Sequence, residues 1–191
     1  MEELIVEWLQ LDGFLSLSNL PVAVSKVGGR FEADVVGARV KGGQLEIRHI
    51  ETGVLGNGRK STASITKKFG DPVISSVKKH FKTALSYKGP EPSYEKIYVA
   101  TYWTEPVIRD LERVDINVVR LPDFILSRVL PAVRAWQENP PHQPLMKGPR
   151  ITLPECLWLS QMLDHLRDKG LLVADWPTDR LHRRACRQSS D

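Results

Sequence analysis

Two acidic residues, Asp34 and Glu51, are the side chains in this sequence best spaced to bind a metal ion together. They lie in two strand-like segments, FEADVVGARVK and QLEIRHIET, which are joined by Gly42-Gly43. Both central residues of a two-residue type I′ turn need positive φ, so a Gly-Gly pair predicts a tight β-hairpin. In the register set by that turn, Asp34 lies opposite Glu51 on one face.

Opposed strand positions hold their Cβ atoms roughly 5 Å apart, and like charges there repel unless something neutralises them. A divalent cation would do so, because Mg²⁺ is typically held by one or two carboxylates together with water or phosphate oxygens. The pair therefore suggests Mg²⁺ or Mn²⁺ and phosphodiester chemistry. From spacing alone, two strand-end acids that point into solvent are the commoner arrangement.

The same register sorts the other polar residues of the hairpin. Arg39 faces Glu46 as an opposite-charge pair on the other face, so we interpret Glu46 as structural. His49 shares the face of Glu51, one pair closer to the turn. A packed or hydrogen-bonded strand histidine is the commoner arrangement, and contact with the acidic pair is the alternative.

The elements that must position the hairpin follow from apolar periodicity. Strand, short helix and strand after residue 95 form a βαβ crossover and hence a parallel pair. Asp71 as N-cap with Pro72 at the first position opens the preceding helix. The predicted elements are a helix over 2–11, a short strand over 15–20, the hairpin over 31–52, the helix from Asp71, a strand over 96–102, a helix over 104–114 and a strand over 116–121.

The C-terminal part is predicted to be helical. Pro131 kinks or divides the first helix there, and NPPHQPLMKGP is a proline-rich linker. Thr152 with Glu155 forms a capping-box start for the next helix. Its apolar stripe from Cys156 to Leu166 packs on the core or forms a partner surface, including that of a homodimer. The predicted organisation is an α/β core over 1–138, a linker over 139–150 and a helical extension with a basic tail over 151–191.

Composition narrows the class of protein. The chain has 191 residues, of which 41% are hydrophobic and 26% charged, as expected for one compact domain. No apolar run approaches the roughly 20 residues of a membrane span. The N-terminus MEELIVEWLQ is acidic where a secretory signal would be basic, and the two cysteines fit no disulfide framework. We therefore expect a cytoplasmic protein without a membrane segment.

Positive charge is concentrated in one stretch of a chain whose net charge is +4. Basic residues outnumber acidic ones strongly between Arg59 and Lys82, which suits either a solvated helix face or contacts to nucleic-acid phosphates. The candidates for phosphate contacts are Arg59, Lys60, Lys78, Lys79 and Lys82.

The segment GVLGNGRKS, from Gly53 to Ser61, is close to a P-loop. Arg59 separates the second glycine from Lys60, whereas a P-loop requires the lysine at once after that glycine. A nucleotide-binding function would need a helix that starts at Ser61.

FEADVVG and LEIRHIETG, behind an N-terminal helix with acidic residues, resemble the PD-(D/E)XK nuclease superfamily, whose restriction-endonuclease-like fold includes archaeal Holliday junction resolvases. The resemblance covers roughly the first 120 residues. It implies an αβββαβ core with a mixed central sheet, followed here by the helical extension. It also implies a metal-dependent nuclease that acts on DNA.

The resemblance assigns metal binding to Asp34 and Glu51. A glutamate on the first helix often completes the family's site, for which Glu3 is our choice and Glu7 the alternative.

The resemblance also calls for a lysine two residues after Glu51, where this chain has Gly53. Some members supply the lysine from a following helix, so Lys67 and Lys68 are both candidates. If neither serves, the resemblance implies a nuclease-fold protein without catalysis that binds nucleic acid or another protein.

Overall fold

The protein is an α/β fold built on one mixed five-stranded sheet, seen in a computed structural model that describes residues 1–24, 30–55, 59–139 and 153–172. The strand order is β1-β2-β3-β4-β5. The first three strands are antiparallel neighbours, and β3, β4 and β5 are parallel. The predicted α/β class and the predicted parallel pair are confirmed. The strands are β1 (Leu15–Val24), β2 (Arg30–Lys41), β3 (Gln44–Val54), β4 (Ser93–Tyr102) and β5 (Asn117–Arg120).

The hairpin of β2 and β3 has the predicted register. Gly42 and Gly43 both have positive φ, 58° and 79°, as a type I′ turn requires. Backbone pairing runs from Lys41 opposite Gln44 to Val35 opposite Ile50. The backbone ladder therefore ends one pair before Asp34 and Glu51, whose side chains form the next hydrogen bonds between the two strands.

Strand β1 is longer than the short strand predicted from alternation. It pairs with β2 along most of its length, with an irregularity between Pro21 and Ala23. Proline lacks an N–H group and is tolerated in a sheet at an edge or a bulge, and β1 is the edge strand. Pairing with β2 thus extends β1 past the proline that interrupts the sequence pattern.

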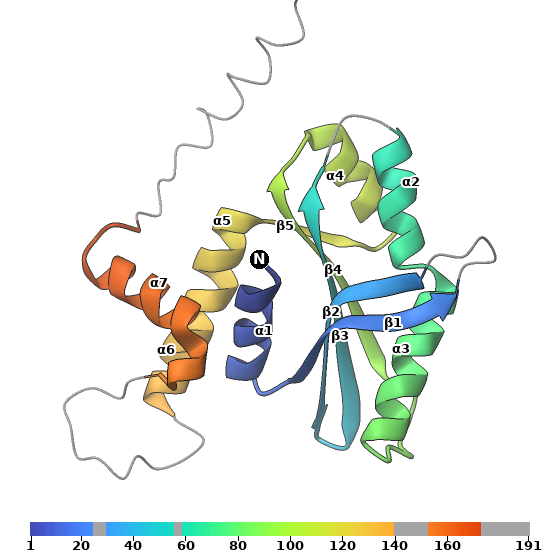
Figure 1. Cartoon of the computed structure of the whole chain (residues 1–191), viewed down its shortest axis with the longest axis horizontal. Helices are drawn as coiled ribbons and strands as arrows, with labels where there is room; N and C mark the ends of the chain where they lie inside the picture. Colours follow the sequence, from blue (N-terminus) through green and yellow to red (C-terminus); the bar gives the residue numbers. More distant parts are fainter. Residues whose placement is uncertain (25–29, 56–58, 140–152, 173–191) are drawn as a thin grey trace, which may run out of the picture.

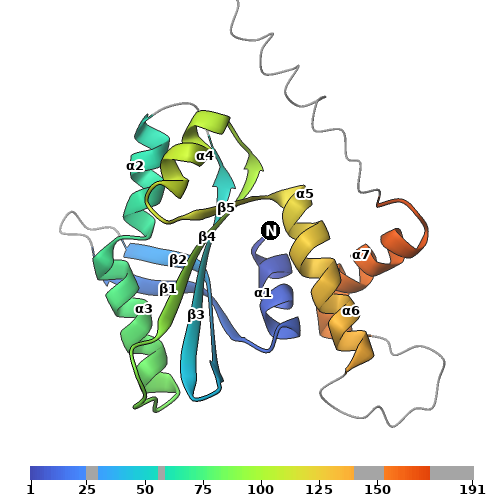
Figure 2. The same cartoon turned by 180° about the vertical axis from the view of Figure 1, so that it is seen from behind.

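Helices cover both faces of the sheet, as the two opposite views show (Figures 1 and 2). On one face lie α1 (Glu2–Leu11), α5 (Leu121–Phe124), the π-helical turn η1 (Ile125–Val129), α6 (Leu130–Glu138), the short turn η2 (Glu155–Leu157) and α7 (Trp158–Asp168). On the other face lie α2 (Arg59–Lys68), α3 (Asp71–Ala84) and α4 (Glu105–Glu112).

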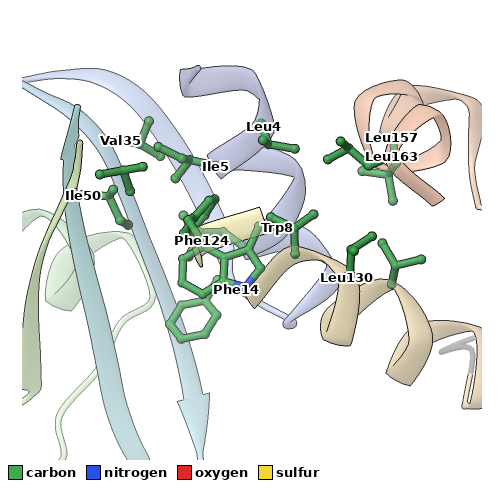
Figure 3. Packing of buried hydrophobic residues seen from close by; sticks show 14 of the residues in the cluster. Leu4, Ile5, Trp8, Phe14, Val35, Ile50, Phe124, Leu130, Leu157 and Leu163 are labelled. Atoms are coloured by element: carbon green, nitrogen blue, oxygen red, sulfur yellow. The ribbon is translucent and has the colours of Figure 1, made fainter. Parts of the chain in front are cut away.

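The first face has one continuous apolar core, part of which Figure 3 shows. Helix α1 lies so close to β2 that a Cβ atom on Gly37 would be 2.9 Å from Leu9 Cδ1. Leu157 and Leu163 of the C-terminal segment join the same core beside Leu4. The predicted helical extension is therefore packed onto α1 rather than separated from it.

Alternation along β4 shows how the two faces are divided. Ile97 and Val99 lie in the core with α1, whereas Tyr98 and Ala100 lie in a second cluster with α2 and α4. A third cluster packs β2 and β3 against α3 through residues such as Val77. Successive strand residues point to opposite faces, so each strand contributes to both cores.

Two helix starts differ from the prediction. Residues 59–68, for which no element was predicted, form α2. Helix α3 has Gly70 as its N-cap, so Asp71 and Pro72 are its first helical residues instead of Asp71 being the cap. Both residues still suit the first turn of a helix. The N–H groups there have no partner within the helix, so proline loses no hydrogen bond, and the positive end of the helix dipole stabilises the negative charge of Asp71.

The helix predicted to be kinked or divided by Pro131 is interrupted by the π-helical turn η1, which lies directly before α6. Pro131 occupies the first turn of α6. A wider turn accommodates a residue that cannot donate its backbone hydrogen bond. The capping residue Thr152 and most of the predicted linker lie outside the described residues.

Among the residues that the structure describes, no helix is both long enough and apolar enough to cross a membrane.

Candidate metal centre

Asp34 and Glu51 contact each other's strands through their side chains. The N–H group of Asp34 donates to Glu51 Oε1 at 3.2 Å. The N–H group of Thr52 donates to Asp34 Oδ2 at 3.0 Å. Carboxylate oxygens thus replace the backbone carbonyls that would continue the ladder, and both carboxyl groups are held at the end of the hairpin.

Lys68, the last residue of α2, completes an arrangement that we call the acid–lysine cluster: Asp34, Glu51 and Lys68. Its ammonium group donates to Asp34 Oδ1 at 3.2 Å and to Glu51 Oε2. The next residue, Phe69, is buried with Ile65 in the core under α2 and α4. That apolar anchor determines where the end of α2 lies, and hence where Lys68 reaches.

Of the two lysines left open by the sequence, Lys68 is therefore the one beside both carboxylates. Lys67, the preceding residue, is exposed. Consecutive helical residues lie about 100° apart around the helix axis, so only one of the two can face the sheet.

Gly53 stands where the PD-(D/E)XK resemblance calls for a lysine. Its φ is +152°, a conformation that residues with side chains rarely adopt. A Cβ atom at Gly53 would lie 2.7 Å from Tyr98 Oη. Backbone conformation and Tyr98 together disfavour a side chain at this position. Lys68 brings an ammonium group to the carboxylates from α2.

The cluster is buried at its base and open toward Lys68. The Glu51 side chain is 0% exposed, Asp34 20% and Lys68 36%. A group that approaches from solvent would meet Lys68 and Asp34 first.

Glu51 is ionised in the folded protein although it is buried. Burial by itself raises its pKa, but hydrogen bonds from His49 and Lys68, together with electrostatic attraction to both groups, outweigh burial and lower the pKa below its ordinary value. Burial disfavours the charged form of Lys68 too and so lowers its pKa. The hydrogen bonds and charges of Glu51 and Asp34 outweigh burial, and the pKa of Lys68 is raised overall. This pair is ionised at neutral pH.

Asp34 behaves in the opposite way. Burial and repulsion from Glu51 raise its pKa above the ordinary value, despite the N–H group of Thr52 and the ammonium of Lys68, which lower it. The folded protein thus disfavours the ionised form of Asp34 relative to the unfolded chain. A second cation near Asp34 would relieve this cost.

Behind Glu51 lie the buried His49 and the half-buried Tyr94, of which the sequence predicted only the position of His49. His49 is 0% exposed and its Nε2 atom lies 2.8 Å from Glu51 Oε1. Its Nδ1 atom lies 2.9 Å from the hydroxyl oxygen of Tyr94. Alternation on β3 placed His49 on the face of Glu51, but no sequence signal linked Tyr94 to it, because parallel pairing of β3 with β4 brings them together.

The two candidate helix glutamates do not join the cluster. Glu3 is exposed on α1. Glu7 is buried, and its carboxylate accepts hydrogen bonds from the N–H groups of Leu159 at 3.1 Å and Ser160 at 2.7 Å. Glu7 therefore binds the N-terminal end of α7, where unpaired N–H groups and the helix dipole favour a negative charge.

The basic residues proposed for phosphate contacts have different surroundings. Lys78 and Lys82 donate to Glu91 at 2.7 and 2.8 Å, and these contacts lower the pKa of Glu91 to about 2. Lys79 is exposed on α3. The side chains of Arg59 and Lys60 lie outside the described part of the structure.

A P-loop is not supported by the start of α2. A nucleotide-binding loop would require the helix to begin at Ser61, whereas α2 begins at Arg59. Residues 56–58 of the glycine-rich segment lie outside the described residues.

The acid–lysine cluster has the donor atoms for a hard divalent ion. Asp34 Oδ1 and Glu51 Oε2 already converge on one positive group, the Lys68 ammonium. Within residues 1–24, 30–55, 59–139 and 153–172, no group of three or more His, Cys, Asp or Glu side chains is arranged to hold a metal ion. A bound Mg²⁺ or Mn²⁺ would thus take two carboxylates from this chain and water or phosphate oxygens from elsewhere.

Comparisons with known proteins identify no family for this chain. No protein-family model matches the sequence, and no curated protein matches it significantly. A solved structure described as "Crystal Structure of Protein of Unknown Function AF1548" is 15% identical, covers 89% of this chain and 77% of its own, and has a TM-score of 0.39. A likeness with so low a TM-score carries no argument about fold or function.

Proposed function

We propose that this protein is a nuclease of the PD-(D/E)XK type, which hydrolyses phosphodiester bonds of DNA with Mg²⁺ or Mn²⁺ held by Asp34 and Glu51. The observation that carries the proposal is the convergence of two carboxylates and the Lys68 ammonium at one point, from three different elements. The sheet order and the helix α1 before it support the restriction-endonuclease-like arrangement.

Each residue of the cluster has a role in this proposal. Glu51 stays ionised because His49 and Lys68 hold its pKa down. Asp34 is the more exposed carboxylate and contributes the second oxygen. Lys68 is cationic and reaches solvent, so it is suited to face a phosphate oxygen of the substrate. The divalent ion would supply the Lewis acid that polarises the phosphate and activates water.

A second candidate is a nuclease-fold protein that binds nucleic acid without cutting it. Two observations favour this alternative. The Lys68 ammonium already compensates both carboxylates, and Glu3 is not part of the cluster.

Plasmid nicking separates the two candidates. Purified protein is incubated with supercoiled plasmid and with branched DNA in Mg²⁺, Mn²⁺ or EDTA. The variants are Asp34→Asn, which keeps the side-chain shape, and the control Asp123→Asn, an exposed carboxylate on α5 across the sheet. The proposal predicts metal-dependent cutting by the wild type and the control, with a loss of at least about 100-fold in Asp34→Asn.

DNA binding without cutting under every metal condition, unchanged by Asp34→Asn, would reject the nuclease and support the binding module. Cutting that persists in EDTA would reject the role of the metal.

A further inference from the structure

His49 is the one histidine among the described residues that is fully buried, and it contacts three parts of the site at once. Its Nε2 atom lies 2.8 Å from Glu51 Oε1, and its Nδ1 atom 2.9 Å from the Tyr94 hydroxyl. Its ring centroid lies 4.6 Å from that of Phe69, the residue next to Lys68. His49 therefore touches both the carboxylate and the segment that carries the lysine.

The two carboxylate oxygen atoms of Glu51 have different hydrogen-bond partners. Oε1 accepts from His49 Nε2 and from the N–H group of Asp34. Oε2 accepts from Lys68. With Oε1 saturated from within the protein, Oε2 is the atom of Glu51 left to face a cation.

The proton on His49 follows from its two partners. A carboxylate only accepts, so Nε2 must carry the hydrogen in that contact. Burial, and to a smaller degree the charge of Glu51, raises the pKa of Tyr94 far above its ordinary value, so the phenol keeps its hydrogen. The Tyr94 hydroxyl can both donate and accept, so its contact with Nδ1 holds the imidazole ring in the orientation that points Nε2–H at Glu51.

We propose that His49, oriented by Tyr94, is the positioning residue of this site: its Nε2–H group holds Glu51 so that Oε2 faces Lys68 and the incoming cation. The inference rests on the proposed function, since it concerns the same carboxylate. Outer contacts of this kind set the orientation of carboxylates and imidazoles around metal ions, and their loss typically weakens metal binding by about 10- to 100-fold.

Mn²⁺ titration of the full chain tests the positioning role. His49→Leu removes the donor and is expected to weaken Mn²⁺ binding by about 10-fold or more. His49→Gln keeps an N–H donor at the end of a side chain of similar reach and should recover part of that affinity. His80→Gln, which changes an exposed histidine on α3, should bind Mn²⁺ as the wild type does.

A purely packing role for His49 predicts a different pattern, because Leu would then preserve affinity better than Gln. Equal Mn²⁺ affinity in the wild type, His49→Leu and His49→Gln would overturn the inference.

Nitrogen NMR of the imidazole tests the arrangement without any metal, which keeps the two proposals separable. In the wild type the shifts should show hydrogen on Nε2 of His49. In Tyr94→Phe, which lacks the hydroxyl but keeps the ring, Nδ1 loses its partner, so the Nδ1 shift should change while Nε2 keeps its hydrogen. Unfolding midpoints of all variants show which of them remain folded.

An imidazole without hydrogen on Nε2 in the wild type would overturn the inference. Failure of the wild type to bind Mn²⁺ would count against the proposed metal chemistry instead, and the nitrogen shifts alone would then decide the role of His49.

Discussion

The ammonium nitrogen of Lys68 lies 3.2 Å from Asp34 Oδ1, although the two residues are 34 positions apart in the chain. This contact joins the end of α2 to the end of the β2–β3 hairpin. It places a positive charge between two carboxylates whose charges would otherwise repel.

Replacement of Lys68 by methionine is expected to destabilise the fold. Glu51 would lose its cation while it stays buried, which costs about 1–3 kcal/mol once the partial exposure of the ammonium is taken into account. Lys67→Met, one residue earlier and exposed, should change stability by less than about 0.5 kcal/mol. Urea unfolding at pH 7 measures both. A similar loss for the two variants would show that the ion pair contributes nothing to stability.

The pH dependence of stability should reveal the shifted pKa of Glu51. Because its folded pKa lies below the unfolded value near 4.5, ionised Glu51 contributes stability above that value and loses it as pH falls through the folded pKa. The difference in unfolding free energy between the wild type and Glu51→Gln should thus be constant from pH 6 to 7 and shrink below about 4.5. A difference that grows on acidification would contradict the lowered pKa.

Asp34→Asn should separate stability from activity. A raised folded pKa means that the neutral form of Asp34 is favoured in the folded state, and its contribution is lost as pH rises through that pKa. A neutral side chain at this position should therefore leave the protein as stable as the wild type at pH 7, or more stable, while nuclease activity disappears. Thermal unfolding of both proteins beside the nicking assay checks this. Marked destabilisation would show that the ionised carboxylate supports the fold.

A side chain at Gly53 should be poorly tolerated. Gly53→Ala would place a Cβ atom 2.7 Å from Tyr98 Oη on a backbone with φ of +152°, with an expected cost of about 1–3 kcal/mol. In a Tyr98→Phe background the hydroxyl is absent, so the same substitution should cost less, and the remaining cost measures backbone strain. Denaturant unfolding of the four proteins gives the coupling. Identical costs in both backgrounds would exclude the Tyr98 contact.

Glu7 should hold the C-terminal helix in place. Glu7→Ala leaves two N–H groups at the start of α7 without their acceptor, at a cost of about 1–3 kcal/mol. Amide hydrogen exchange at Leu159 and Ser160 should accelerate in this variant more than exchange in β3. Glu3→Ala, on the exposed side of α1, serves as the control and should leave both amides protected. Unchanged exchange in Glu7→Ala would show that α7 is held by apolar contacts alone.

The sequence by itself determined the hairpin and its acidic pair. Gly42 and Gly43 impose a local turn, and the period of two along each strand then fixes which residues share a face. The same reasoning predicted α1 and the parallel pair of β4 with β5, because their signals lie within short stretches of chain. The choice of Glu46 as structural also followed from the register, and its contact with Arg39 at 2.7 Å agrees with it.

Only the tertiary structure determined which of Lys67 and Lys68 lies beside the carboxylates, and that Glu3 and Glu7 lie elsewhere. Those positions depend on where whole helices dock, which Phe69 determines for α2 and the buried core for α1 and α7. The contact between Gly53 and Tyr98 likewise arises from the parallel pairing of β3 with β4. Docking is the sum of many weak apolar contacts between distant segments, and no short pattern in the sequence records its outcome.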